Sequence, residues 1–368
     1  MTISRRKMIT MIGGGTILAA GAATGGFMVT RTPDKALAPW STAGGYTDPR
    51  KRALSYALLA PNPHNIQPWL VALEGDNALS LYHDPSRRLE HTDPMDRQIT
   101  IGLGCFLEQM RIAATLDGLT ANIALFPAGP EGAIARVVFE PGAARDPLAG
   151  AIMGRRSCKD PYEETALEPG VVKTMGEYAR IVTDKAEVSD LRDLTWAAWK
   201  MEWDTPRTLM ESVDLMRFGK GEINASPDGI ALGGPFLEGL MLAGMLTRKA
   251  QADPESVTYK EGVKMYRETL YATPAYAVLT SKGNTRVDQI NAGYRWLRLN
   301  LATTRAGLAL HPVSQALQEY PEMSAHYAQA HATLAAPGET VQMLGRLGYG
   351  PKTAPTPRWP LEAKLRSG

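Results

Sequence analysis

The sequence predicts an α+β fold built from two related halves of one chain. Helical and strand-like patterns are mixed along the 368 residues without the regular strand–helix–strand spacing of a doubly wound parallel sheet. Residues 104–119 (GCFLEQMRIAATLDGL) also align without gaps on residues 293–308 (GYRWLRLNLATTRAGL). Two amphipathic helices can converge by chance, and an internal duplication is the alternative.

Residues 1–33 have the pattern of a twin-arginine export signal. Ser4-Arg5-Arg6-Lys7 precedes a Gly/Ala-rich, mildly apolar stretch that ends near Thr30. Ala20-Gly21-Ala22 offers a cleavage site, and an uncleaved segment acting as a membrane anchor is the alternative. A plain basic terminus would also contain such arginines. We expect a periplasmic or extracytoplasmic protein that uses the twin-arginine export machinery.

Residues 34–147 are predicted to form the first half. Its copy of the repeated helix carries Phe106, Leu107 and Met110 at helical spacing, and Gly118 is placed as a C-terminal cap. Strand candidates are the β-prone stretches 79–82, 122–126 and 135–139. A Pro/Gly-rich run at 141–147 then forms the junction with the next half.

Residues 148–368 are predicted to form the second half, with strand candidates at 276–280 and 308–312 on either side of the second helix. An insertion at about 191–260 has no counterpart in the first half and is rich in Met and Trp. Such adaptable apolar side chains form either a core layer or a lid. The sequence leaves both interpretations open.

Composition directs the search toward a small-molecule site. The formal net charge is only +2 and charged residues make up 21% of the chain, so no broad basic surface suggests a nucleic-acid partner. Cys105 and Cys158 lie far apart and lack metal-ligand spacing, so neither a metal cluster nor a disulfide framework is indicated.

A proline-rich loop holds the first candidate site residues, Ala60-Pro61-Asn62-Pro63-His64-Asn65-Ile66-Gln67-Pro68-Trp69. Amides such as Asn65 and Gln67 offer both donors and acceptors, which suits the edge of a heteroaromatic ring. The prolines stiffen the backbone and hold those amides in place. A simple turn before a strand is the alternative.

Two further segments carry basic side chains. Arg155-Arg156-Ser157-Cys158-Lys159 clusters guanidinium, hydroxyl and ammonium groups, which together suit a phosphate monoester, although a basic cluster is often only a solvated face. In an extended segment Arg155, Ser157 and Lys159 would point one way. Near the carboxyl end, Gly348-Tyr349 is followed by Pro357-Arg358-Trp359-Pro360, in which Arg358 is either a phosphate ligand or an exposed tail residue.

The residues of these segments resemble the motifs of the FMN-dependent nitroreductase family. The resemblance covers most of residues 48–365 and excludes residues 191–260. The family commonly has Ser where Asn62 stands, so a hydroxyl contact there is in doubt. Residues 307–312 match the place where the family's backbone passes the flavin ring, and His311 within them is either structural or a proton donor. The resemblance implies FMN contacts from Asn62, His64, Asn65, Gln67, Arg155, Arg156, Ser157, Lys159, Pro312 and Arg358.

The order of these motifs implies an intramolecular pseudo-dimer. Family members begin with the Arg-x-Ser motif and reach the Asn-x-Gln-Pro motif later, within each protomer of a homodimer. Here the Asn/Gln loop belongs to the first half and the arginine motif opens the second. Because each half lacks the other's motif, we expect one FMN per chain. No Gly-x-Gly-x-x-Gly fingerprint for a dinucleotide is present.

The resemblance implies a nitroreductase-type oxidoreductase that transfers a hydride or electrons to a nitroaromatic, a quinone or a similar small acceptor. NAD(P)H is the family's donor, but nicotinamide cofactors are scarce outside the cytoplasm. The alternative is a protein that binds or sequesters FMN under a lid with little turnover. A specialised member that fragments flavin or handles halogenated aromatics is a third possibility. The sequence names no catalytic residue and no substrate.

Overall fold

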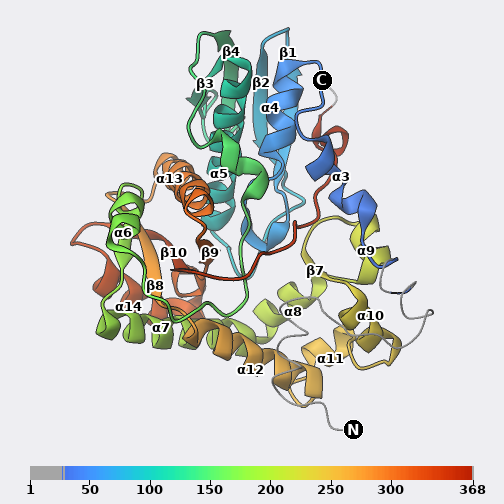
Figure 1. The fold of residues 1–368 in the computed structure, drawn as a ribbon, viewed down its shortest axis with the longest axis vertical. Coiled ribbons are helices and arrows are strands. Elements are labelled where there is room, and N and C mark those ends of the chain that lie inside the picture. Colours follow the sequence, from blue (N-terminus) through green and yellow to red (C-terminus); the bar gives the residue numbers. More distant parts are fainter. Residues whose placement is uncertain (1–26, 28–29, 367–368) are drawn as a thin grey trace.

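The computed structural model describes Phe27 and residues 30–366, so the predicted twin-arginine motif lies outside the described residues. Two four-stranded antiparallel sheets lie on either side of a central helix pair, and a mainly helical insertion extends to one side (Figure 1). The predicted α+β class is confirmed.

The first half supplies the upper sheet in Figure 1, in the strand order β1-β2-β4-β3. All five strand candidates of the chain correspond to strands, and those of this half became β2, β3 and β4. The elements of this half are α3 (Asp34–Thr42), α4 (Pro49–Ala57), η1 (Pro63–Asn65), β1 (Trp69–Glu74), β2 (Ala78–His83), α5 (Arg97–Ala114), η2 (Thr115–Asp117), β3 (Leu119–Leu125) and β4 (Ala135–Pro141).

The second half forms the other sheet, in the order β5-β8-β10-β9. When the four strands of each sheet are numbered along the chain, the two sheets have the same order. In both, the helix of the central pair follows the second strand. The elements of this half are η3 (Ala149–Gly154), α6 (Pro169–Gly176), β5 (Arg180–Val182), β8 (Ala275–Ser281), α13 (Arg286–Arg305), β9 (Ala309–Pro312), η4 (Gln315–Leu317), η5 (Pro321–Met323), α14 (Ser324–Leu334), β10 (Thr340–Gly348) and η6 (Leu361–Lys364).

The insertion separates β5 from β8, at the position where the first half has only the short turn between β1 and β2. Its first and last helices pass through the expected boundaries at 191 and 260. It contains α7 (Lys185–Asp204), α8 (Pro206–Asp214), β6 (Met216–Phe218), α9 (Gly219–Ala225), β7 (Ile230–Leu232), α10 (Pro235–Leu242), α11 (Arg248–Ala252) and α12 (Val257–Tyr271).

The two repeated helices, α5 and α13, cross at their glycines. A Cβ on Gly104 would lie 2.3 Å from the Ile290 carbonyl oxygen, and one on Gly293 would lie 2.2 Å from the Ile101 carbonyl oxygen. Each helix therefore presents the equivalent glycine to the other, and only residues without a side chain permit this backbone approach.

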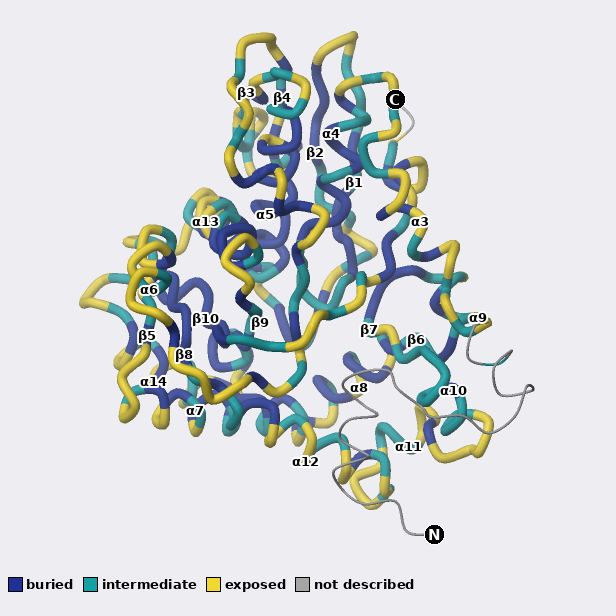
Figure 2. The backbone as a smooth tube through the Cα atoms, in the orientation of Figure 1, coloured by how far each residue is buried: buried dark blue, intermediate teal, exposed yellow. Residues whose placement is uncertain are grey.

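The core divides the insertion into two parts. Leu191, Leu194 and Trp199 of α7 are buried in the cluster beneath β8 and β10, so this helix belongs to the second half's core. Between Thr205 and Tyr259 the insertion has a small cluster around Leu209, Val213, Met216 and Tyr259. The end of α12 rejoins the second half's core through Leu270. Figure 2 shows the buried backbone concentrated in α5, α13 and the sheets, with α9 to α11 largely intermediate or exposed.

Among the described residues, Arg97–Asp117 is the one helical stretch long and apolar enough to span a membrane, but 83% of its most apolar window is buried inside the protein. Its Arg97 guanidinium crosses into the second half, where it donates to the carbonyl oxygens of Gln342 (2.8 Å) and Leu317 (2.7 Å). This helix is therefore the central element of the fold and links its halves.

Candidate functional site

The loop between α4 and β1 has an unusual backbone. His64, Asn65 and Gln67 have φ angles of 45°, 54° and 52°, in the left-handed region that non-glycine residues rarely adopt. Such a conformation persists only where the surrounding structure fixes it, and it is enriched at ligand sites.

The predicted amides fix this loop. Asn62 Oδ1 accepts the Gln67 N–H at 2.8 Å, and the Gln67 amide donates to the Pro227 carbonyl at 2.8 Å and accepts the Trp359 N–H at 2.9 Å. Asn65 donates to the Pro357 carbonyl at 3.1 Å and accepts from Arg358. Because Gln67 is fully buried and both ends of its amide are engaged, these side chains shape the loop. The half-buried His64 imidazole makes none of these hydrogen bonds.

Three arginines from the two predicted basic segments gather beneath this loop. Arg155 donates to the Leu59 carbonyl at 2.7 Å and to Asn300 Oδ1 at 3.0 Å. Arg358 donates to the carbonyls of Leu58, Leu59 and Ala60 at 2.8 to 3.2 Å. The guanidinium of Arg156 lies 4.1 Å from the ring centroid of Trp40.

No described carboxylate pairs with Arg155, Arg156 or Arg358, although Arg155 and Arg358 are each only 3% exposed. Burial, reinforced by the neighbouring guanidinium charge, lowers the pKa of Arg155 to about 10 and that of Arg358 well below its usual range. The buried Nε atoms of Arg155 and Arg156 also lack hydrogen-bond partners. Buried charge without a counterion is costly, and an anion bound at this cluster would lower that cost.

The predicted role of Arg358 as a phosphate ligand is limited because its donor groups are already hydrogen-bonded within the protein. Its Nε and both terminal nitrogens donate to backbone carbonyls, to Asn65 and to Thr356. Those contacts tie the carboxyl-terminal segment to the Asn/Gln loop. Arg358 therefore contributes positive potential and loop geometry, and the less engaged donors in the cluster belong to Arg156.

Ser157 and Lys159 continue the basic segment toward β9. The Cys158 N–H donates to the Leu310 carbonyl at 3.2 Å, which fixes this segment beside His311 and Pro312. Lys159 is solvent-accessible yet surrounded by protein atoms, and this desolvation lowers its pKa. Its charge in turn lowers the pKa of both His64 and His311. Lys159 is therefore exposed beside β9, whereas Arg155 points into the protein.

His311 is buried, and its Nδ1 accepts from Arg346 at 3.2 Å. Burial and the charges of Arg346 and Lys159 lower its pKa well below the usual value, so the imidazole is neutral near pH 7. His64 is likewise neutral, because burial lowers its pKa to about 4 against the opposing charge of Glu211. Neither ring supplies a cationic acid.

The insertion is bonded directly to the Asn/Gln loop. The Gly229 N–H donates to the Asn65 carbonyl at 3.2 Å, next to the Gln67–Pro227 bond. Asp228 accepts from Arg87, Arg217 and Trp359 at 2.6, 2.7 and 2.9 Å. The segment 227–229 thus holds the insertion against the loop on which the candidate site is built.

Sequence reasoning missed several of these partners. Trp40, Glu211 and Asp228 belong to no motif, and their contacts depend on tertiary structure alone. Asn300 is recognisable in the sequence as a polar residue among the apolar positions of the repeated helix, and such a residue indicates a buried hydrogen-bond partner. Lys364, only 2% exposed, donates to the Gln67 carbonyl at 2.7 Å.

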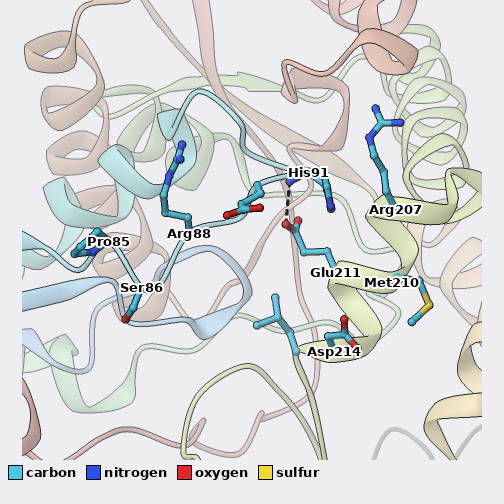
Figure 3. A pocket seen from close by; sticks show the side chains of 10 residues that line it. Pro85, Ser86, Arg88, His91, Arg207, Met210, Glu211 and Asp214 are labelled. Atoms are coloured by element: carbon cyan, nitrogen blue, oxygen red, sulfur yellow. Dashed lines mark hydrogen bonds between the residues drawn. The ribbon is translucent and has the colours of Figure 1, made fainter.

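A separate surface pocket of about 380 Å³ lies where α8 meets residues 85–91 (Figure 3). None of the predicted site residues line it. Its Arg88 and Arg207 are paired with Asp96 and Glu322, and its Glu211 accepts the His91 N–H at 2.9 Å, as Figure 3 shows. No group of three or more His, Cys, Asp or Glu residues in the described chain could hold a metal ion.

Comparisons with known proteins find relatives over part and over most of the chain. No family model matches the chain. It is 40% identical over 81 residues to the "Putative NAD(P)H nitroreductase acg" of Mycobacterium tuberculosis, a match that spans 22% of this chain and 24% of that relative. It is 23% identical over 326 residues to the "Putative NAD(P)H nitroreductase Rv3131" of the same organism, covering 84% and 88% of the two chains. A crystal structure described as a putative nitroreductase from Anabaena variabilis is 12% identical, covers 92% of this chain and 93% of that one, and has a TM-score of 0.45.

Proposed function

We propose that this protein is an FMN-dependent oxidoreductase of the nitroreductase type, with the cofactor bound between the two halves of the chain. The observation that carries the proposal is the cluster of the buried Arg155 and Arg358 with the half-buried Arg156, none of which has a described carboxylate partner. The motif residues and the similarity to proteins named NAD(P)H nitroreductases support the same assignment.

The residues fit a phosphate monoester. Arg156 and the Ser157 hydroxyl would hold the phosphate from the exposed side, and Arg155 and Arg358 would neutralise its charge from beneath. A phosphate would in turn supply the missing counterion, so binding would relieve the cost of three clustered guanidinium groups.

The ring would lie between the Asn/Gln loop and β9. The loop is held rigid by its own amides, and the hydrogen bond from Cys158 to the Leu310 carbonyl fixes the segment with Lys159 beside β9. When bound, FMN supplies the hydride and electron transfer. The chain's task is then to orient the cofactor and to exclude water, and neither neutral histidine is required as an acid.

We further propose that the chain is a fused pseudo-dimer with one FMN. The two sheets share a strand order, and equivalent glycines meet where α5 crosses α13. The Asn/Gln loop belongs to the first half and Arg155 to Lys159 to the second, so one composite site would be complete. This follows the domain division at 34–147 and 148–368.

Export through the twin-arginine route, to a periplasmic or other extracytoplasmic location, is proposed from residues 1–33 alone. Outside the cytoplasm the electron donor would be a reductant other than NAD(P)H. The acceptor would be a nitroaromatic, a quinone or a similar small aromatic molecule. FMN sequestration is the second candidate function. It is favoured by the hydrogen bonds that join Pro227 and Gly229 to the Asn/Gln loop, because an insertion held at that loop would restrict access to the ring.

The purified protein tests the proposal directly. Flavin released by acid should be FMN on chromatography, and FAD, or no flavin after reconstitution with excess FMN, would defeat it. Oxidation of NADPH with a nitroaromatic then separates the two functions. Turnover with NADPH, or oxidation of the photoreduced flavin by the nitroaromatic, supports the reductase, and stable FMN binding without either reaction supports sequestration.

A further inference from the structure

The helix α10 has an inverted distribution of polar and apolar side chains. Glu238 is its one buried residue, whereas the apolar residues of α10 and the following turn are half-buried or exposed. Leu242 is 78% exposed and Met245 is 50% exposed. We define the α10 face as Phe236, Leu237, Leu240, Met241, Leu242 and Met245.

This face packs into no part of the described core. None of its residues belongs to any of the three hydrophobic clusters. Single exposed apolar residues are ordinary, but a contiguous group on one helix and its turn marks an interaction surface. The exposed tip Leu242-Ala243-Gly244-Met245 contains no charged or hydrogen-bonding side chain.

The chain entering the fold is attached beside this face. Arg31 pairs with Glu238 at 3.3 Å, and the Lys220 ammonium donates to the Thr30 carbonyl at 3.1 Å. The preceding sequence runs from Arg5-Arg6-Lys7 into an apolar, Gly/Ala-rich stretch. If that stretch enters a bilayer, Arg31 follows it directly, and the Arg31–Glu238 pair keeps α10 close to the lipid surface.

The surroundings suit lipid headgroups. A pocket of about 250 Å³ beside α10 is lined by Arg31, Lys220 and Glu238 together with Phe218, Met241 and Leu242. Arg248 and Lys249 are exposed just after the tip. Arg31, Lys220 and Arg248 are paired with Glu238, Asp34 and Glu222, so Lys249 is the basic side chain of this group that has no ion-pair partner among the described residues and would meet anionic lipid.

We propose that the α10 face lies in the interface of a lipid bilayer, beside the amino-terminal segment, so that the insertion rests on the membrane. The inference does not depend on the flavin. It differs from anchoring by the amino-terminal segment alone because it assigns a second contact and fixes the protein's orientation.

The test uses the full chain reconstituted into vesicles of phosphatidylglycerol and phosphatidylethanolamine. Leu242→Cys is labelled with an environment-sensitive fluorophore, since the native Cys105 and Cys158 are buried. The matched control is Val287→Cys in α13, where the valine is 43% exposed. Figure 1 shows α13 on the other side of the molecule from α10. Circular dichroism verifies that both variants fold.

The label at 242 should shift to shorter emission wavelength in vesicles and be quenched by spin-labelled lipid several-fold more than the label at 287. Equal quenching at the two positions would overturn the proposal. So would a label at 242 in an apolar environment that lipid quenchers do not reach, because a second copy or the amino-terminal segment would then cover the face.

Discussion

Replacing Gly293 with alanine tests how closely the two halves are joined. The added Cβ would lie 2.2 Å from the Ile101 carbonyl oxygen and 2.7 Å from Gly104 Cα, whereas real Cβ contacts stay beyond 3.0 Å, so α5 and α13 must separate by about 0.8 Å. Overpacking of this kind costs about 1 to 3 kcal/mol. The atoms in the way are backbone atoms, which cannot rotate aside, so we take the upper value.

Alanine also favours the helical state by about 1 kcal/mol relative to glycine. The expected net loss for Gly293→Ala is therefore about 2 kcal/mol of the free energy of unfolding. Gly262 in α12 is the matched control, since a Cβ there meets nothing within 4 Å. Gly262→Ala should stabilise the protein by up to about 1 kcal/mol.

Urea unfolding of the two variants and the parent measures this difference. Gly104→Ala should behave like Gly293→Ala, and the double variant should cost less than the sum because the helices are already apart. If Gly293→Ala proved as stable as Gly262→Ala, the close helix crossing would be wrong.

The remaining predictions concern the site and the insertion. Arg156→Ala should weaken FMN binding roughly ten- to a hundredfold with little change in the unfolding midpoint. Arg358→Ala should mainly lower stability, by about 1 to 3 kcal/mol, because it leaves the buried Leu58 carbonyl without a donor, whereas the Leu59 and Ala60 carbonyls keep bonds from Arg155 and Asn62. FMN titration and urea unfolding that gave the same pattern for both variants would contradict this division. Burial raises the pKa of Glu202 to about 7. The folded state then binds more protons than the unfolded state between about pH 4.5 and 7, so stability falls as pH rises through that window, and Glu202→Gln should be more stable than the parent at pH 8 by up to about 3 kcal/mol. Parallel pH profiles would refute it. Replacing residues 206–256 with a Gly/Ser linker keeps α7 and α12, so the variant should stay folded and bind FMN. Its flavin should be reduced faster by dithionite than the flavin of the parent. An unchanged reduction rate would rule out a covering role for the segment, and an insoluble product would show that the segment belongs to the core.

The strands that sequence patterns predicted are those with clear β-prone runs. The sequence pattern does not predict the long strand β10, because Gln342, Gly345 and Arg346 interrupt its apolar residues, although all three are buried. Arg346 is tolerated there because it donates to His311 and Thr273. β5 has only three residues, too few to carry a period.

The site was predictable only where its residues are close together in sequence. Arg155 to Lys159 and the Asn/Gln loop form local motifs, but Trp40, Asn300 and Asp228 reach the site from distant segments. The amides were expected to face a ring, and the structure uses them to hold left-handed backbone at His64, Asn65 and Gln67. No propensity reveals that requirement, since these residue types seldom adopt it.

The crossing of α5 and α13 has a further consequence because both helices belong to one chain. In a site shared by two subunits, dilution separates the subunits and releases whatever lies between them. Here the covalent connection sets the local concentration of one half around the other, and that value does not change with the amount of protein present. A ligand held between the halves would leave at a rate fixed by its own contacts, equally in a crowded cell and in a single isolated molecule.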